Sequence, residues 1–305
     1  MTPASRQTQG MNDKPHHGTI FLEDATVLET EAFAGRQFRL RLQAPHCAAA
    51  AEPGSFMHVS CDAALPMRRP MSIMRVSRND GWVECLYKMV GDGTRLLAER
   101  QRGDVISCLG PIGRPFTLHP ERPRTLLIGG GVGIPPMIFL AEALRSDARA
   151  RWQPLVLMGS EVPFPFEARP SALPLSAMPK ETSACMPLME DWNIPSRLAS
   201  LQGYPGCYQG YVTDLARHWL SKLDQKALAE TEIFACGPTP MLKAAAQLAQ
   251  QFGVPSQISM EEFMACAVGG CAGCNVEVRT PEGPAMKRVC VDGPVFDGAS
   301  VFPIN

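Results

Sequence analysis

Residues 125–136 read TLLIGGGVGIPP, and this stretch decides the fold of the segment around it. Residues 125–128 form a short apolar run typical of a buried parallel strand. The glycines within 129–133 predict a tight turn, and the prolines at 135–136 open a helical pattern. A strand, a glycine turn and a helix in this order are typical of the phosphate-binding unit of a doubly wound α/β sheet.

Strand-like and helix-like segments alternate through the residues that follow this turn. Apolar runs at 154–158 and 232–235 predict buried strands, and the patterns at 137–145 and 240–252 predict helices. Such alternation indicates a doubly wound parallel sheet, whose ligands bind at the carboxyl ends of its strands. The proline-rich stretch 162–195 has no pattern that assigns it.

Upstream of this unit the chain changes to short runs with the alternation of β-strands. The runs are 38–42, 56–60, 71–76, 82–90 and 104–109. Several short strands separated by polar turns predict an antiparallel β-barrel or sandwich over residues 20–118.

Near the C-terminus, three cysteines share one short loop. Cys266, Cys271 and Cys274 are followed by Cys290, which gives the C-x4-C-x2-C…C spacing of plant-type ferredoxins. The residues within the loop are mostly Gly and Ala, which let backbone N–H groups approach inorganic sulfides. The spacing predicts a two-iron, two-sulfur (2Fe-2S) cluster held by these four thiolates.

Two other uses of these cysteines stay open. Structural zinc sites usually combine two C-x2–4-C pairs, whereas here the ligands fall as three plus one. Disulfides need an oxidising compartment. The chain has eleven cysteines, and those outside the loop are scattered among apolar or small residues. This scatter predicts buried, reduced thiols.

The composition argues against several classes of protein. A net charge of −1 over 305 residues gives no support for binding nucleic acid or anionic membranes, and no apolar run reaches the length of a membrane span. Residues 1–17 are polar, lack the apolar core of an export signal and predict a disordered leader. Reduced thiols without an export signal predict a cytoplasmic protein.

Two short motifs lie in the predicted barrel, and each has an ordinary explanation when taken alone. Arg69-Pro70-Met71-Ser72 lies on a predicted strand, where an arginine can bind a pyrophosphate bidentately. Residues 86–94, LYKMVGDGT, end in a glycine turn before a helix, which presents N–H groups to an anion. A surface arginine and a capped helix are the ordinary alternatives.

Two more motifs lie in the predicted doubly wound sheet. The glycine turn departs from the G-x-G-x-x-G pattern and reads G-x-G-x-x-P, at Gly131, Gly133 and Pro136. The glycines let a pyrophosphate approach the backbone, and a proline costs little where a helix begins. Cys236-Gly237-Pro238 ends a predicted strand, so Cys236 is either a packing thiol or a neighbour of a reactive ring.

In this order, the four motifs and the cysteine loop resemble the ferredoxin-NADP reductase superfamily. Residues 263–274 and 288–296, FMACAVGGCAGC and RVCVDGPVF, are similar to electron-transfer subunits of class B (NAD-linked) dihydroorotate dehydrogenase. The resemblance covers about residue 18 to the C-terminus. The chain departs from this family in carrying Ala267 where glycine is common and Phe263 where a polar or basic residue is common.

The resemblance implies which residues hold each cofactor. FAD would be bound by Arg69, Pro70, Met71, Ser72, Leu86, Tyr87, Lys88, Gly93 and Thr94. The nicotinamide nucleotide would be bound by Gly130, Gly131, Gly133, Pro136, Cys236, Gly237 and Pro238. The cluster would be held by Cys266, Cys271, Cys274 and Cys290. No catalytic residue is assigned, although Ser72 and Cys236 are expected near the flavin and the nicotinamide.

The resemblance also implies a division of the chain. After the leader come an FAD-binding barrel over 18–120, an NAD-binding α/β domain over 121–255 and a 2Fe-2S domain over 256–305. A nicotinamide exchanges a hydride and a cluster takes one electron at a time, whereas a flavin does both. The flavin is therefore expected between the other two groups.

The implied partner is a catalytic subunit that carries FMN and oxidises dihydroorotate to orotate in pyrimidine biosynthesis, in an expected heterotetramer. Two alternatives stay open. One is an NAD(P)H oxidoreductase subunit that serves a hydrogenase or a ferredoxin, and the other is a redox-sensing subunit without turnover. Glu161 follows a predicted strand and would repel a 2′-phosphate, which favours NAD over NADP.

Overall fold

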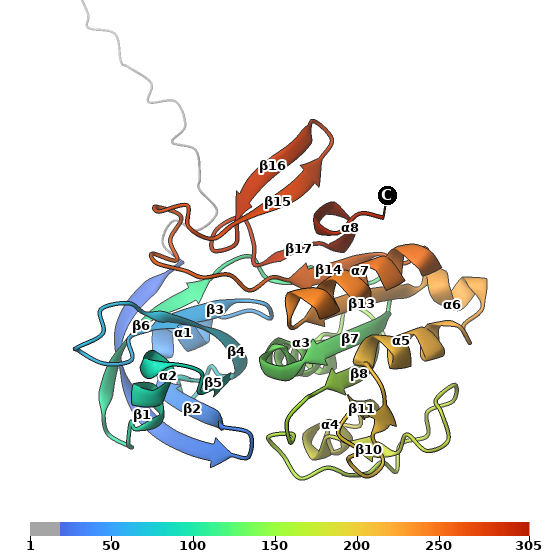
Figure 1. The fold of residues 1–305 in the computed structure, drawn as a ribbon, viewed down its shortest axis with the longest axis horizontal. Coiled ribbons are helices and arrows are strands. Elements are labelled where there is room, and N and C mark those ends of the chain that lie inside the picture. The colour runs from blue at the N-terminus through green and yellow to red at the C-terminus, as the bar shows by residue number, and fades with distance from the viewer. Residues whose placement is uncertain (1–18, 305) are drawn as a thin grey trace, which may run out of the picture.

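The computed structural model describes residues 19–304, and the predicted leader over 1–17 lies outside them. In this range the chain forms a closed barrel, a seven-stranded sheet and a hairpin that projects from both (Figure 1). No helix among the described residues combines the length and the apolar character needed to cross a membrane.

Six antiparallel strands close the barrel in the order β1-β2-β5-β4-β3-β6. They are β1 (Phe21–Phe33), β2 (Gln37–Gln43), β3 (Phe56–Val59), β4 (Arg69–Ser77), β5 (Trp82–Lys88) and β6 (Val105–Ile112). Alternate residues point inward, so Leu40, Cys85 and Ile106 are buried in one apolar core. Helix α1 (Pro45–Ala50) adds Cys47 to this core, and α2 (Asp92–Ala98) adds Leu97. The predicted antiparallel barrel is confirmed.

The second sheet has the order β12-β11-β8-β7-β13-β14-β17 and is parallel except for β17. Its strands are β7 (Arg124–Gly130), β8 (Gln153–Gly159), β11 (Ser196–Ser200), β12 (Tyr208–Gln209), β13 (Thr231–Cys236), β14 (Ser256–Ser259) and β17 (Val295–Asp297). Its helices are η1 (Gly131–Gly133), α3 (Ile134–Ser146), α5 (Val212–Leu220), α6 (Gln225–Ala229) and α7 (Thr239–Phe252).

Helices cover both faces of this sheet. Leu126 and Ile128 of β7 share a core with α5 and α7, whereas Leu127 shares a core with α3. Because neighbouring residues of a strand point to opposite faces, α3 lies on one face and α5 and α7 lie on the other. The predicted doubly wound sheet is confirmed.

The C-terminal segment forms the projecting hairpin and then returns to the sheet. The hairpin consists of β15 (Asn275–Thr280) and β16 (Gly283–Arg288), and α8 (Gly298–Val301) follows β17. Strands β14 and β17 both fall within residues 256–305, the predicted 2Fe-2S domain. In the structure they are hydrogen-bonded into the seven-stranded sheet. The division of the chain into domains stays a prediction.

The proline-rich segment folds around two charged side chains next to β11, one half-buried and one buried. It contains β9 (Arg169–Pro170), β10 (Ala184–Cys185) and α4 (Pro187–Asp191). The Glu190 carboxylate accepts bonds from the Ala172 and Leu173 N–H groups and the Ser171 hydroxyl. The buried Arg197 guanidinium donates to the main-chain carbonyls of Leu173 and Thr182 in this segment. These bonds replace the secondary structure that the prolines prevent.

Candidate functional site

Two of the predicted flavin motifs meet at the start of β4. The Arg69 guanidinium lies over the first turn of α2, where a Cβ at Gly93 would be 2.9 Å from Arg69 Nε. Arg69 Nη1 donates to the main-chain oxygens of Met67 (2.8 Å) and Arg68 (3.2 Å). Glycine at 93 therefore lets a cation lie against the N–H groups of a helical turn, which is a suitable environment for a phosphate.

Thr94 holds the shape of the same turn. Its hydroxyl accepts bonds from the N–H groups of Val90 (3.0 Å) and Gly91 (3.2 Å) and donates to the Gly91 carbonyl (3.0 Å). Thr94 is buried. The hydroxyl is thus used within the turn, so its contribution is to fix the loop in front of α2.

The remaining flavin candidates divide between two faces of the barrel wall. Met71 and Tyr87 point into the barrel core, where the Tyr87 ring stacks on Phe38 at 5.7 Å between centroids. Leu86 faces outward into the core shared with α3, and Lys88 is exposed. Any contact from Tyr87 to a flavin on the outer face would therefore come from its backbone.

The two nicotinamide motifs form adjacent parts of the second sheet. Strands β7 and β13 are parallel neighbours, with Gly129 opposite Cys236. The chain leaves β7 toward β8 on one side, while β13 lies on the other side. This pair is the topological switch point of the sheet, where ligands of such folds bind.

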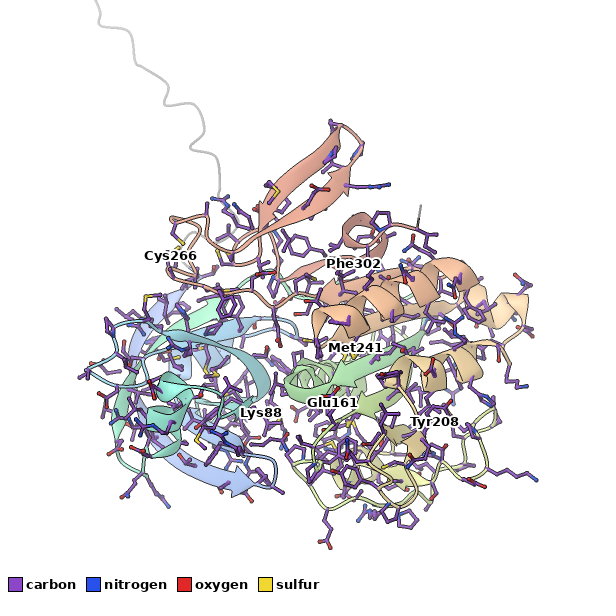
Figure 2. The ribbon with its side chains drawn as sticks, viewed as in Figure 1. Lys88, Glu161, Tyr208, Met241, Cys266 and Phe302 are labelled. Carbon is purple, nitrogen blue, oxygen red and sulfur yellow. The ribbon has the colours of Figure 1, made fainter. Side chains whose placement is uncertain are left out.

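Close packing joins the glycine turn to the Cys236 motif. A Cβ at Gly133 would lie 2.2 Å from the Cys236 carbonyl oxygen, and one at Gly130 would lie 2.4 Å from Met241 Sδ. Figure 2 shows Met241 on the sheet side of the molecule, together with Glu161, and Lys88 on the barrel side. Glycine is required at position 133 because backbone atoms fill the space of a side chain, whereas a side chain at position 130 would displace the Met241 side chain.

Cys236 is fully buried at the end of β13. Burial raises the pKa of its thiol, and the nearby Glu261 carboxylate raises it further. The thiol is therefore protonated at neutral pH and packs as a small apolar group.

The four C-terminal cysteines lie as two pairs. The Cys271 N–H donates to Cys266 Sγ at 3.3 Å, and the Val289 N–H next to Cys290 donates to the Cys274 carbonyl at 2.9 Å. Cys266 and Cys271 lie toward solvent, whereas Cys274 and Cys290 are buried. The loop thus carries an outer pair and an inner pair of thiols.

The electrostatics of the two pairs differ. Partial burial raises the pKa of Cys266, but N–H donors of Val268, Cys271 and Gly270, with the Cys271 thiol, outweigh it and lower the pKa to about 7. Burial and the neighbouring Cys274 thiol raise the pKa of Cys290 to about 12. The N–H groups around Cys266 stabilise a thiolate, as a cluster ligand requires.

The two pairs match the donor set of a two-iron cluster. A 2Fe-2S cluster takes two thiolates on each iron. The 266/271 and 274/290 pairs offer two thiols each.

One large hollow lies apart from these groups. It has a volume of about 1050 Å³ and shares no residue with the predicted cofactor sites. Its lining comes from Leu28, Glu29, Thr30, Ala32, Phe38, Arg41, Trp82 and 98–102.

Known proteins match both the C-terminal segment and the whole chain. Residues 261–302 match the iron-sulfur cluster binding domain of dihydroorotate dehydrogenase B. The dihydroorotate dehydrogenase B (NAD(+)) electron transfer subunit of Geobacillus thermodenitrificans is 35% identical over 284 residues, covering 92% of this chain and 98% of that protein. The subunit of Desulforamulus reducens is 31% identical, with 90% and 95% covered. The chain belongs to this family of electron transfer subunits.

Solved structures agree with membership of this family. The NADH-dependent reduced ferredoxin-NADP oxidoreductase matches with a TM-score of 0.72 at 26% identity, covering 92% of this chain and 90% of that one. The cytochrome b5 reductase domain of Ulva prolifera nitrate reductase shares the fold, with a TM-score of 0.56 at 16% identity and 80% and 96% covered. The predicted reductase fold and iron-sulfur domain are confirmed.

Backbone geometry explains one departure of this chain from its family. Ala267 has φ 56° and Ala272 has φ 52°, both in the left-handed region, as has Gly269 at φ 80°. Glycine adopts such angles without the penalty that a Cβ brings. Glycine would be the relaxed choice at position 267, and Ala267 holds this bend at a conformational cost.

Sequence reasoning missed a side chain that joins the cluster loop to the turn of the fourth cysteine. Arg288 Nη1 donates to the Gly269 carbonyl at 2.9 Å, and the Arg288 N–H donates to Asp292 Oδ2 at 2.8 Å. Its position two residues before Cys290 was the only available signal. Arg288 holds the two parts of the ligand set together.

Proposed function

We propose that this chain is the electron-transfer subunit of an NAD-linked dihydroorotate dehydrogenase and acts in pyrimidine biosynthesis in the cytoplasm. When bound, FAD, the 2Fe-2S cluster and NAD supply the conversion between single electrons and a hydride. The observation that carries the proposal is the similarity along nearly the whole chain to named subunits of this enzyme, joined to paired cysteines. A catalytic subunit with FMN would oxidise dihydroorotate to orotate.

The barrel would hold FAD through the residues named in the sequence. The contact between Arg69 and Gly93 supports a pyrophosphate position at the start of α2. Ser72 is half-buried on β4, three residues after Arg69, and would contact the ring end of the flavin. Leu86 and Lys88 would contact it from the next strand.

The nicotinamide nucleotide would lie across the switch point of the sheet. Gly130, Gly131, Gly133 and Pro136 would give the pyrophosphate access to the backbone. Gly237, Pro238 and the backbone of Cys236 would face the nicotinamide, since the Cys236 thiol is buried. The exposed Glu161 follows the carboxyl end of β8, which supports NAD over NADP. NADPH should therefore reduce the flavin more slowly than NADH.

We propose that the catalytic subunit docks on the surface around residues 263–274, which includes the cysteine loop. Cys271 is exposed and Phe263 is 94% exposed, so this loop offers both a thiolate ligand and an apolar side chain at the surface. A heterotetramer of two subunits of each kind is the expected assembly. The chain alone should not oxidise dihydroorotate.

The test is reconstitution from separate subunits. The purified chain, with flavin and cluster loaded, should oxidise NADH with an artificial acceptor but show no turnover with dihydroorotate. Addition of the FMN subunit should produce dihydroorotate-dependent NAD+ reduction. Dihydroorotate oxidation by the chain alone would contradict the proposal.

A second candidate function is electron transfer between NADH and a ferredoxin. The similarity to an NADH-dependent reduced ferredoxin-NADP oxidoreductase favours it as the alternative partner class. Ferredoxin reduction by NADH, with no response to the FMN subunit, would select this candidate. A redox-sensing subunit would bind NADH without bleaching the flavin.

A further inference from the structure

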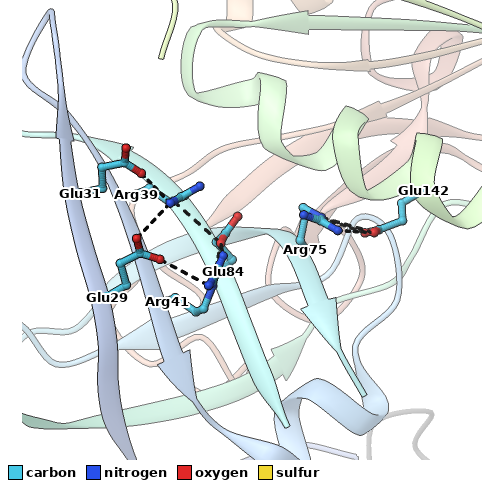
Figure 3. Close-up of polar contacts among 7 residues, drawn as sticks. All are labelled: Glu29, Glu31, Arg39, Arg41, Arg75, Glu84 and Glu142. Atoms are coloured by element: carbon cyan, nitrogen blue, oxygen red, sulfur yellow. Dashed lines mark hydrogen bonds and ion pairs between the residues drawn. The ribbon is translucent and has the colours of Figure 1, made fainter. Parts of the chain in front are cut away.

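An ion pair joins the barrel to the nucleotide-type sheet. Arg75 of β4 donates through Nη2 to Glu142 Oε1 of α3 at 2.7 Å, and its Nε lies 3.3 Å from the same oxygen and 3.4 Å from Oε2. Figure 3 shows this pair apart from a second network, which links Glu29, Glu31, Arg39, Arg41 and Glu84 within the barrel. Of the ion pairs drawn there, this one crosses from strand to helix.

Local structure directs Arg75 toward α3. A bulge shifts the register of β4 between Ile73 and Arg75. Ile73 and Val76 pack in or against the barrel core, whereas Met74 lies in the core of the α3 face of the sheet. The bulge therefore puts Arg75 outside the barrel on the same side as Met74, where it reaches Glu142. Bulges re-aim side chains and are common next to active sites. Without this bulge, regular alternation along β4 would turn Arg75 to the same side as Ile73, toward the barrel core.

A ring contact holds the arginine in this position. The Arg75 guanidinium carbon lies 5.3 Å from the centroid of the Trp192 ring, and that of Arg145 lies 5.8 Å from it. Arg75 and Glu142 side chains are 28% and 25% exposed. A guanidinium bound by a carboxylate and an aromatic face at once has fewer orientations than a free one.

Helix α3 also packs into the barrel. Phe139 belongs to the apolar core of the barrel, whereas Ile138 belongs to the core of the sheet. The helix is therefore shared by both parts of the molecule, and Glu142 extends this contact by one further turn. The ion pair lies at the solvent-side limit of a buried contact.

Both partners are short distances along rigid elements from the proposed cofactor residues. Arg75 is three residues after Ser72 on β4, and Glu142 lies on the helix that begins directly after the Gly131–Gly133 turn. We propose that Arg75 and Glu142 are positioning residues. They fix β4, which carries the proposed flavin residues, against α3, which follows the proposed nicotinamide turn. In this way they set how the flavin ring and the nicotinamide ring approach each other. This inference rests on the proposed function.

The expected effect follows from the distance dependence of hydride transfer. A displacement of about 1 Å can slow such a reaction by about 100-fold. Loss of one ion pair beside an intact apolar contact should produce a smaller shift. We expect flavin reduction by NADH to slow by roughly 10-fold, with NAD+ affinity changed by less than about 2-fold.

The experiment compares Arg75→Gln, Glu142→Gln and the exchanged pair Arg75→Glu/Glu142→Arg with the unaltered chain. Arg124→Gln is the matched control, because Arg124 pairs with Glu230 at 3.6 Å with similar exposure at the opposite end of β7. Stopped-flow absorbance measures flavin reduction and the nicotinamide–flavin charge-transfer band. Arg75→Gln and Glu142→Gln should each show slower flavin reduction and a weaker charge-transfer band. The exchanged pair should recover most of the rate and of the band. Arg124→Gln should match the unaltered chain.

A second measurement keeps the inference separate from the proposed function. Hydrogen exchange, followed by mass spectrometry on the chain without NADH, reports the order of β4 and of the glycine turn. Faster exchange in both segments of Arg75→Gln, but not of Arg124→Gln, supports the coupling even if NADH fails to reduce the unaltered chain, which would defeat the proposed function alone. Unchanged exchange, or unchanged rate and charge-transfer band in an active chain, overturns the inference.

Discussion

The cluster loop and the flavin–nicotinamide region are built in opposite ways. The four proposed cluster ligands come from one loop and one adjacent turn, and two of the four thiols lie toward solvent. The flavin–nicotinamide region joins residues far apart in sequence, such as Arg69 with Gly93 and Gly133 with Cys236, through contacts in which a Cβ on the glycine would displace its neighbour. We expect the cysteine loop to be stabilised by its metal and the flavin–nicotinamide region to be set by packing before a ligand arrives.

This difference predicts that the two regions fail separately. Loss of a cluster ligand should leave the flavin–nicotinamide region intact, because β7, β13 and α3 have their own buried cores. Overpacking in the flavin–nicotinamide region should destabilise the seven-stranded sheet as a whole. The variants below test that separation in order of expected effect.

The largest effect is expected for Cys290→Ser. Removing one of the two buried thiols of the inner pair should abolish iron and sulfide retention and reduce electron exchange with the catalytic subunit by more than about 100-fold. NADH should still bleach the flavin at a normal rate. Cys207→Ser, another buried cysteine, is the control and should keep its iron. Loss of flavin reduction in Cys290→Ser would show that the regions are not independent.

The next effect is expected for Gly133→Ala. Its Cβ would lie 2.2 Å from the Cys236 carbonyl, so the turn or β13 must move. We expect the free energy of unfolding in urea to fall by about 3 kcal/mol. Val132→Ala at the half-buried neighbouring position should lower it by less than about 1 kcal/mol. Equal stability of Gly133→Ala and the unaltered chain would contradict the packing argument.

A smaller effect is expected for Gly93→Ala. The new methyl group would displace the Arg69 guanidinium from the α2 turn and weaken FAD binding about 10-fold, or about 1.4 kcal/mol. Equilibrium titration of the flavin-free chain measures this affinity. Gly91→Ala is the control, since no atom lies within 4 Å of its Cβ. If both variants bind FAD equally, Arg69 does not contact the flavin phosphates.

The smallest effect is expected for Ala267→Gly. Relief of the left-handed φ should stabilise the cluster loop by about 1 kcal/mol and slow iron release to a chelator. Ala265→Gly changes an exposed residue of the same loop without a positive φ and should release iron slightly faster. Faster release from Ala267→Gly would mean that the buried methyl group matters more than the backbone angle.

Sequence was a good guide where chemistry depends on local spacing. The strand before Gly129 and the parallel strand before Cys236 follow from patterns within short windows. The four cysteine positions come from such a window too, and their role as cluster ligands stays a prediction. Strand alternation also predicts that Leu86 and Tyr87 point to opposite sides, and in the structure Tyr87 points into the barrel while Leu86 points outward.

Other features depend on contacts between distant residues. No local pattern shows that Arg75 meets Glu142, because the bulge in β4 and the docking of α3 are tertiary effects. The return of β17 to pair with β14 was also not predicted, since three residues give little periodic signal. The pairing of Glu190 and Arg197 with backbone groups explains why the proline-rich segment could not be assigned.

The most direct test of the account is analysis of iron, sulfide and flavin in the anaerobically purified chain, with an electron paramagnetic resonance spectrum after addition of NADH. The account predicts equal iron and sulfide, bound FAD, and a paramagnetic reduced cluster that appears with NADH and is absent from Cys290→Ser. A colourless chain with zinc at the four cysteines and no spectral response to NADH would contradict it.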